Sequence, residues 1–129
     1  MLKDSEAFSG YSVDDLDKAR DFYSGTLGIE TSMEPAGLAI KIPGRRPVFV
    51  YPKENHEAAT FTVLNFPVGD IEAAVDQLTA AGVTMEHYGE GFGQDEKGIS
   101  RDPRGPAIAW FKDPAGNILS VIEDTGPSS

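Results

Sequence analysis

The sequence contains no cysteine and only two histidines in 129 residues. The absence of cysteine excludes disulfides, thiolate nucleophiles and thiolate metal sites. Basic residues are also few, because 11 Lys and Arg stand against 21 Asp and Glu and give a net charge of −10. This charge argues against a nucleic-acid partner, which needs a basic surface, and it suits a cationic ligand better than an anionic one.

Long hydrophobic runs are also missing. No apolar stretch approaches the roughly 20 residues that a membrane-spanning helix requires, so we expect no membrane partner. Residues 1–6 contain no apolar signal core, which predicts a cytoplasmic protein. The chain is 40% hydrophobic and 25% charged, as globular proteins are. Its length suits a single domain spanning residues 1–129.

A tight turn between two apolar runs is the most distinctive local pattern. Residues 108–112 and 118–123 alternate in the manner of strands and flank Asp113-Pro114-Ala115-Gly116-Asn117. Proline presets the first corner of such a turn, and glycine supplies the positive φ that closes it. Residues 108–123 are therefore predicted to form a β-hairpin.

The first half of the chain has a regular order of elements. Residues 7–13 are predicted to form a strand, Asp14-Asp15 to cap a helix and Gly28 to end it. One face of that helix is apolar, since it carries Leu16, Ala19, Phe22, Tyr23 and Leu27. Three short strands are expected next, at residues 29–33, 38–42 and 48–51.

The second half repeats this order. Residues 60–68 are predicted to form a strand, followed by a helix from Asp70 to Gly82, a strand at residues 83–88, a long loop at 89–106 and the late hairpin. The strand and cap recur at an offset of 55 residues and the terminal glycine at 54, so one residue is dropped inside the helix. We therefore expect an α+β fold made of two β-α-β-β-β modules, residues 5–52 and 60–124.

This paired organisation resembles the vicinal oxygen chelate superfamily, which includes glyoxalase I, bleomycin-resistance proteins and extradiol dioxygenases. The matching strings are Phe22-Tyr23 with Leu27-Gly28 at the end of the first helix, and residues 110–117 in the hairpin. The resemblance covers nearly the whole chain. It implies that the two modules form a curved mixed sheet around a cleft, and that the protein is a homodimer.

Enzymes of this superfamily hold a divalent metal through His and Glu side chains on the strands that line the cleft. The resemblance places those ligand positions here at Phe8, Val63, Ser120 and within residues 48–51, where every residue is Val, Phe or Tyr. None of these positions carries His, Asp or Glu. His56 and His87 lie in separate polar segments and do not restore the set. We therefore expect neither a metal nor another cofactor.

Strand alternation and the long loop indicate which side chains would line a binding cleft. The expected ligand-binding residues are Phe8, Ser12, Phe49, Val63, Asn65 and Ser120 on the strands, with Tyr88, Asp95 and Lys97 from the loop region. Gln94 belongs to the same charged and polar loop cluster. Two alternatives stay open, because the loop could be a solvated surface and the apolar cleft could be filled by its own side chains.

These observations favour a metal-free protein that binds a small organic molecule in an apolar cleft, as bleomycin-resistance proteins do. The first alternative is a metal-dependent lyase, isomerase or dioxygenase of the same superfamily with a rearranged metal site. The second is an interaction module whose cleft has closed. The sequence alone leaves open whether the protein is an enzyme, and it assigns no catalytic residue.

Overall fold

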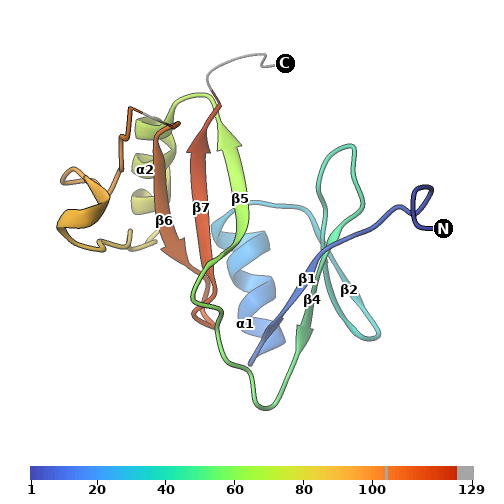
Figure 1. Cartoon of the computed structure of the whole chain (residues 1–129). Coiled ribbons are helices and arrows are strands. Elements are labelled where there is room, and N and C mark those ends of the chain that lie inside the picture. Colours follow the sequence, from blue (N-terminus) through green and yellow to red (C-terminus); the bar gives the residue numbers. More distant parts are fainter. Residues whose placement is uncertain (104, 125–129) are drawn as a thin grey trace. The chain divides into compact units, whose positions relative to one another are not determined.

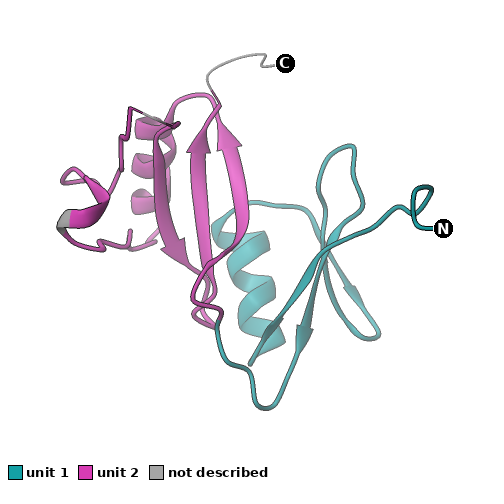
Figure 2. Cartoon of the chain, viewed as in Figure 1, with its two compact units in different colours: residues 1–58 teal, residues 59–129 magenta. Residues whose placement is uncertain are grey.

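The computed structural model describes residues 1–103 and 105–124, without the side chain of residue 90. The chain divides into two compact units, residues 1–58 and 59–129 (Figure 2). Each unit contains a sheet and a helix of its own (Figure 1). Among the described residues, no helix is both long enough and apolar enough to cross a membrane.

The first unit contains a four-stranded mixed sheet. Its elements in chain order are β1 Gly10–Val13, α1 Leu16–Arg20, the π-helix η1 Asp21–Thr26, β2 Thr31–Glu34, β3 Gly37–Ile40 and β4 Val48–Pro52. The strands lie in the order β1-β4-β3-β2, with β1 parallel to β4 and the other neighbours antiparallel. This order is the expected β-α-β-β-β arrangement.

One face of this sheet forms the core of the first unit. Strand alternation directs Leu38, Ile40 and Val50 to the same face, and all three are fully buried. The helix α1 lies against β3 and β4 and contributes Ala19. At its start, the Asp15 side chain accepts a hydrogen bond from the Lys18 backbone N–H at 3.1 Å, which confirms the predicted cap.

The first helix changes its winding halfway along. After α1 it continues as η1, and the N–H of Leu27 bonds to the carbonyl of Phe22, five residues back. Such wide turns commonly accommodate one residue more than an α-helix would hold. Asp15 and Gly28 are 13 positions apart, whereas Asp70 and Gly82 are 12 apart. The π-helix therefore contains the residue by which the two repeats differ.

The second unit has a three-stranded sheet. Its elements are β5 Thr62–Val68, α2 Ile71–Ala80, the short 3₁₀-helix η2 Glu90–Phe92, β6 Ile108–Lys112 and β7 Ile118–Glu123. The strand order is β5-β7-β6, with β5 parallel to β7 and β6 antiparallel to it. The helix α2 covers one face of β6 and β7, and it begins at Asp70, whose side chain accepts from the Ala73 N–H at 3.1 Å.

The predicted hairpin is confirmed, and a buried carboxylate holds its turn. Asp113 is 4% exposed, and its Oδ1 accepts hydrogen bonds from the backbone N–H groups of Ala115 and Asn117, both at 2.9 Å. Its Oδ2 accepts from the Asn117 side-chain amide at 3.0 Å. Gly116 has a φ of 87°, which a residue with a Cβ rarely adopts.

The strand predicted at residues 83–88 is wrong, because this segment belongs to neither sheet. Its Glu86 N–H donates a hydrogen bond to the Trp110 carbonyl of β6 at 2.8 Å. The Gln94 side chain instead accepts from the Tyr88 N–H and donates to the Glu86 carbonyl. The Gln94 amide thus bonds to backbone groups of Glu86 and Tyr88 that a neighbouring strand would otherwise bond to.

The α+β class with mixed sheets is confirmed, and the other element boundaries shift by a few residues. The largest change is in β1, which begins at Gly10 and leaves residues 7–9 of the predicted strand outside the sheet. Of the expected loop at residues 89–106, residue 104 lies outside the described part of the chain.

The wide turn of η1 predicts that two single-residue deletions, one in η1 and one in α2, differ in their effect on the free energy of unfolding. Deletion of Gly25 in η1, where an added Cβ would meet nothing within 4 Å, should convert the wide turn to an α-turn. We expect the free energy of unfolding to change by less than about 1 kcal/mol, because the buried face stays continuous. Chemical denaturation monitored by circular dichroism measures this change.

The matched deletion is that of Gln77, an exposed residue in the regular helix α2. Removing one residue rotates every later residue by about 100° about the helix axis. Leu78 would leave the apolar face, so we expect a loss of at least about 2 kcal/mol. Equal losses for the two deletions would contradict the role assigned to the wide turn.

Candidate functional site

A row of three side chains crosses the face of the second sheet that α2 does not cover. In the strand register Asn65 lies beside Ser120, and Ser120 lies opposite Trp110. Ser120 is fully buried, and its hydroxyl donates a hydrogen bond to Asn65 Oδ1 at 2.5 Å. The two neighbours of Ser120 along β7, Leu119 and Val121, point to the helix-covered face by strand alternation. The uncovered face therefore has a polar pair at its centre and an indole beside it.

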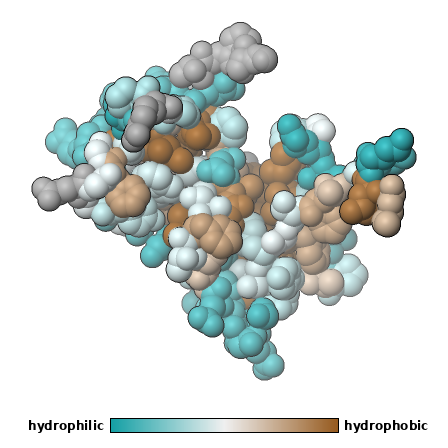
Figure 3. Space-filling model, in the orientation of Figure 1, coloured by the Kyte–Doolittle hydropathy of each residue, from teal (hydrophilic) through white to brown (hydrophobic). Residues whose placement is uncertain are grey.

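Three aromatic rings gather at one end of this row. The ring centroids of Tyr88 and Trp110 are 5.4 Å apart, those of Tyr88 and Phe92 5.3 Å, and those of Phe92 and Trp110 5.8 Å. The three pairs are tilted or edge-on, the arrangement in which ring quadrupoles attract. Phe92 remains 47% exposed, and apolar residues also reach the surface elsewhere (Figure 3).

The hydroxyl of Tyr88 is buried and has no hydrogen-bond partner among the described residues. Buried polar groups almost always have a partner, and leaving one unpaired costs about 1–3 kcal/mol. Burial raises the pKa of the Tyr88 phenol above its ordinary value of 10.0, and the Glu86 carboxylate raises it further. The phenol is therefore a neutral hydrogen-bond donor, and the described residues offer it no acceptor.

Gln94 organises the loop that follows Tyr88. Its Oε1 accepts from the Tyr88 N–H at 2.6 Å, and its Nε2 donates to the carbonyls of Glu86 and Gly98, both at 2.8 Å. A shallow pocket of about 420 Å³ lies beside it, lined by His87, Gly89, Gly93 and Gln94. All polar atoms of the Gln94 amide take part in these bonds, so its role here is structural.

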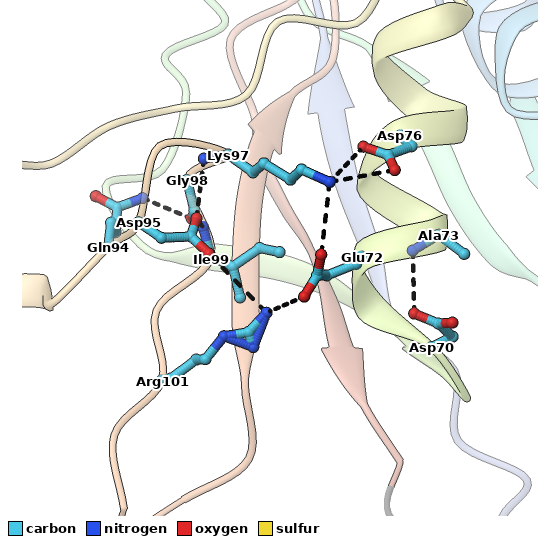
Figure 4. Close-up of polar contacts among 10 residues, drawn as sticks. All are labelled: Asp70, Glu72, Ala73, Asp76, Gln94, Asp95, Lys97, Gly98, Ile99 and Arg101. Carbon is cyan, nitrogen blue, oxygen red and sulfur yellow. Dashed lines mark hydrogen bonds and ion pairs between the residues drawn. The ribbon is translucent and has the colours of Figure 1, made fainter.

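Asp95 and Lys97 contact other parts of the protein (Figure 4). Asp95 Oδ1 accepts from the backbone N–H groups of Lys97 at 2.9 Å and Ile99 at 3.0 Å. Lys97 Nζ lies 3.1 Å from Asp76 and 3.5 Å from Glu72, both on α2, and Arg101 lies 3.0 Å from the same Glu72. The hydrogen bond to Asp76 is the main cause that raises the pKa of Lys97. These contacts tie the loop to the helix, and ligand binding by Asp95 and Lys97 stays a prediction.

Three other predicted residues lie in the first unit. Ser12 is half-buried on β1, and its hydroxyl is hydrogen-bonded to Nδ1 of His56 at 2.7 Å. Phe49 stacks on Tyr51 with centroids 6.5 Å apart. Phe8 precedes β1, is 58% exposed and lies under the guanidinium of Arg46 at 5.1 Å. Ser12 and Phe49 alternate with the core residues, so they share the face that α1 leaves uncovered.

Val63 lies in β5 beside the Asn65–Ser120 pair, at an irregularity in the strand register. The pairing with β7 shifts between Thr62 and Leu64, so Val63 has no partner in the ladder. The structure thus brings Val63, Asn65, Ser120 and Tyr88 into one unit, and Phe8, Ser12 and Phe49 into the other. Whether these residues bind a ligand stays a prediction.

Sequence reasoning left Trp110 undecided and overlooked two other features. Trp110 is opposite Ser120, and counting outward from the turn at residues 113–117 would have found this pairing. Phe92 has no pattern of its own, since it stands among glycines. The Ser12–His56 pair joins a strand to a segment expected to be solvated surface, and nothing in the sequence indicates it.

The side chains at the expected metal-ligand positions do not fit a divalent metal. Phe8 and Val63 have no donor atom, and the Ser120 hydroxyl already donates to Asn65. Within residues 1–103 and 105–124, no group of three or more His, Cys, Asp or Glu side chains could hold a metal ion. No chemical step through a metal is therefore assigned to these residues.

The three bonds of Gln94 predict a local loss of stability when the amide is removed. Gln94→Ala leaves a backbone N–H and two carbonyls without partners, so we expect a cost of about 2–3 kcal/mol. Urea denaturation measures it. The matched control is Glu96→Ala, an exposed position in the same loop, which should change stability by less than about 0.5 kcal/mol.

The raised pKa of Tyr88 predicts a loss of stability at alkaline pH. The folded protein holds the phenol proton more tightly than the unfolded chain does. The resulting stabilisation is complete below the unfolded pKa of about 10 and is lost as the pH rises through the folded value. We expect Tyr88→Phe to remove this part of the alkaline decline without loss of stability at pH 7. Parallel slopes for the two proteins between pH 9 and 11, at about 25 °C, would contradict this.

Comparisons with known proteins agree with this architecture. The family model of the Glyoxalase/Bleomycin resistance protein/Dioxygenase superfamily matches residues 8–121. The comparison with curated proteins found no match. Among solved structures, TnmS3, an antibiotic binding protein from Streptomyces sp. CB03234, is 22% identical with a TM-score of 0.67, over 91% of this chain and 94% of that one.

Two further structures have other described activities. The fosfomycin resistance protein FosX from Listeria monocytogenes is 15% identical with a TM-score of 0.68, over 92% of both chains. Lactoylglutathione lyase from Agrobacterium tumefaciens is 24% identical with a TM-score of 0.64, over 92% of this chain and 93% of that one. At these identities the likeness concerns the fold alone. The family model spans most of the sequence, and the chain therefore belongs to the Glyoxalase/Bleomycin resistance protein/Dioxygenase superfamily.

Proposed function

We propose that this protein binds a small organic molecule with a flat aromatic part, and that no metal takes part in binding. The observation that carries the proposal is the face of the second sheet opposite α2, where the Trp110 indole lies beside the Ser120–Asn65 pair. Ligand sites are mostly apolar and aromatic, with a few polar groups that fix orientation. This face has that composition.

The side chains at the metal-ligand positions support the metal-free part of the proposal. Phe8 and Val63 are apolar, and the Ser120 hydroxyl is hydrogen-bonded within the protein. Zinc, nickel and iron in proteins are held mainly by imidazole, carboxylate or thiolate donors. The alternative, a metal-dependent lyase, isomerase or dioxygenase, needs a ligand set different from the one that the family pattern places here.

The face of the first unit that α1 leaves uncovered is also aromatic, because Phe49 and Tyr51 stack there beside Ser12. The antibiotic binding protein among the similar structures supports the general class of function. We further propose that the protein is a cytoplasmic homodimer, and sedimentation as a single chain would contradict the dimer.

A fluorescence titration tests binding, because Trp110 is the single tryptophan of the sequence. The probes are proflavine, a neutral dihydroxyanthraquinone and anthraquinone-2-sulfonate, which are planar and differ in charge. We expect saturable quenching with one probe bound per chain, strongest for proflavine because the net charge is −10. Binding should be unchanged by a chelator. Binding that requires added nickel, zinc, manganese or iron would favour the enzyme alternative.

Calorimetry with variants locates the binding. Trp110→Ala should weaken the binding of the best probe by about 2- to 12-fold, the equivalent of the 0.5–1.5 kcal/mol of an aromatic pair. The control is Met33→Ala, an exposed residue at the end of β2 in the other unit. An equal loss in both variants, or no loss in Trp110→Ala, would contradict the site.

A further inference from the structure

Residues 89–93 form a glycine-rich segment of the second unit, in which the side chain of residue 90 is not described. Three of its five residues are glycine, and Gly89 and Gly93 have φ values of 92° and 59°. A Cβ added at Gly89, Gly91 or Gly93 would meet nothing within 4 Å. The space beside these three glycines is therefore open, and the glycines at both ends of the segment permit large changes of φ and ψ.

The base of the segment is fixed on both sides. Gln94 Oε1 accepts the Tyr88 N–H at 2.6 Å and so joins the residues that flank the segment. The same amide donates to the carbonyls of Glu86 and Gly98, and Lys97 and Arg101 hold the following residues to α2 (Figure 4). Movement is thereby confined to residues 89–93.

Two contacts of Phe92 hold the segment against the sheet. The Ser100 hydroxyl donates to the Phe92 carbonyl, and the Phe92 ring packs against the rings of Tyr88 and Trp110. A neutral hydrogen bond contributes about 0.5–1.5 kcal/mol and an aromatic pair a similar amount. Contacts of this strength place the segment among the parts of a protein that open without global unfolding.

Opening of the segment would allow a ligand to reach the buried Tyr88 hydroxyl. With the segment closed, that hydroxyl has no acceptor among the described residues, which do not include the side chain of residue 90, although its ring packs against Trp110. A ligand that displaced the Phe92 ring could stack on Tyr88 and Trp110 and place an oxygen atom against the phenol. The closed state costs one unpaired donor, and the liganded state would not.

We propose that residues 89–93 form a flap over the aromatic cluster, and that its opening admits a ligand whose ring oxygen accepts a hydrogen bond from Tyr88. The ligand class is a planar quinone or aryl ketone, which combines a flat apolar ring with a carbonyl acceptor. The ligand part rests on the proposed function, whereas the flap itself does not.

The flap is tested without any ligand. Ser100→Ala removes the hydroxyl that bonds to the Phe92 carbonyl, and the control Ser24→Ala changes an exposed serine in η1. We expect the acrylamide quenching constant of Trp110 to rise at least about twofold in Ser100→Ala alone, since loss of one such hydrogen bond changes an opening equilibrium about 2- to 12-fold. Hydrogen exchange should also be faster at residues 89–93 while α2 is unaffected.

A second variant guards against a general loss of folding in Ser100→Ala. Gly91→Ala adds a Cβ into open space and stiffens the segment without removing a contact. It should slow exchange at residues 89–93 and slow probe association in stopped-flow measurements. Unchanged quenching in Ser100→Ala together with unchanged exchange in Gly91→Ala would overturn the flap.

A pair of probes tests the ligand class. Anthraquinone-2-sulfonate and anthracene-2-sulfonate have the same charge and ring system, but only the quinone has carbonyl oxygens. We expect the wild-type protein to bind the quinone about fivefold more tightly, as one neutral hydrogen bond allows, and Tyr88→Phe to abolish the difference. A difference that persists in Tyr88→Phe would overturn the role of Tyr88. If neither probe nor proflavine binds, the proposed function and the ligand class both fail, while the quenching and exchange data still decide the flap.

Discussion

The second unit depends on the hydrogen bonds that the buried Asp113 carboxylate accepts. The carboxylate accepts three N–H groups inside the five-residue turn between β6 and β7 and so fixes how the two strands pair. A slip of one residue would turn every side chain of the hairpin to the opposite face. The turn therefore determines that Trp110 lies opposite Ser120 and that Phe111 and Leu119 are buried beneath α2. Both the core and the candidate binding face follow from one side chain.

The Ser120–Asn65 pair lies at one of the positions where the family resemblance places a metal ligand. In the family pattern the Ser120 position carries a metal ligand, and here it carries a hydroxyl that donates to a neighbouring amide oxygen. A buried hydroxyl and an amide that satisfy each other need no cation. The pair therefore keeps the face polar at its centre while the surrounding Trp110, Tyr88 and Phe92 remain apolar.

Local signals predicted the elements well and the tertiary contacts poorly. Asp15 and Asp70 cap their helices, and Gly28 and Gly82 have positive φ, because these effects depend on neighbouring residues alone. The segment at residues 83–88 failed as a strand because Gln94, a residue from the following loop, takes its backbone groups. A short apolar run in the sequence does not show that a side chain from another segment will bond to its backbone groups.

The candidate site was predicted in part for the same reason. The family resemblance selected Val63 and Ser120, and strand alternation, a local property of the backbone, added Asn65 to Val63. The contacts of Lys97 with α2 and of Ser12 with His56 depend on where distant side chains meet. The missing partner of the Tyr88 hydroxyl is a property of the whole environment, and no residue pattern encodes it.

The π-helix η1 also bears on how this chain tolerates changes of length. A residue added to a regular helix rotates everything that follows it and would displace the buried side chains of the next strand. Here the surplus residue is confined to Asp21–Thr26, and Gly28 still ends the helix with a φ of 70°. The winding of one short segment thus isolates the insertion, so that two halves of unequal length can keep the same succession of strand, cap, helix and glycine.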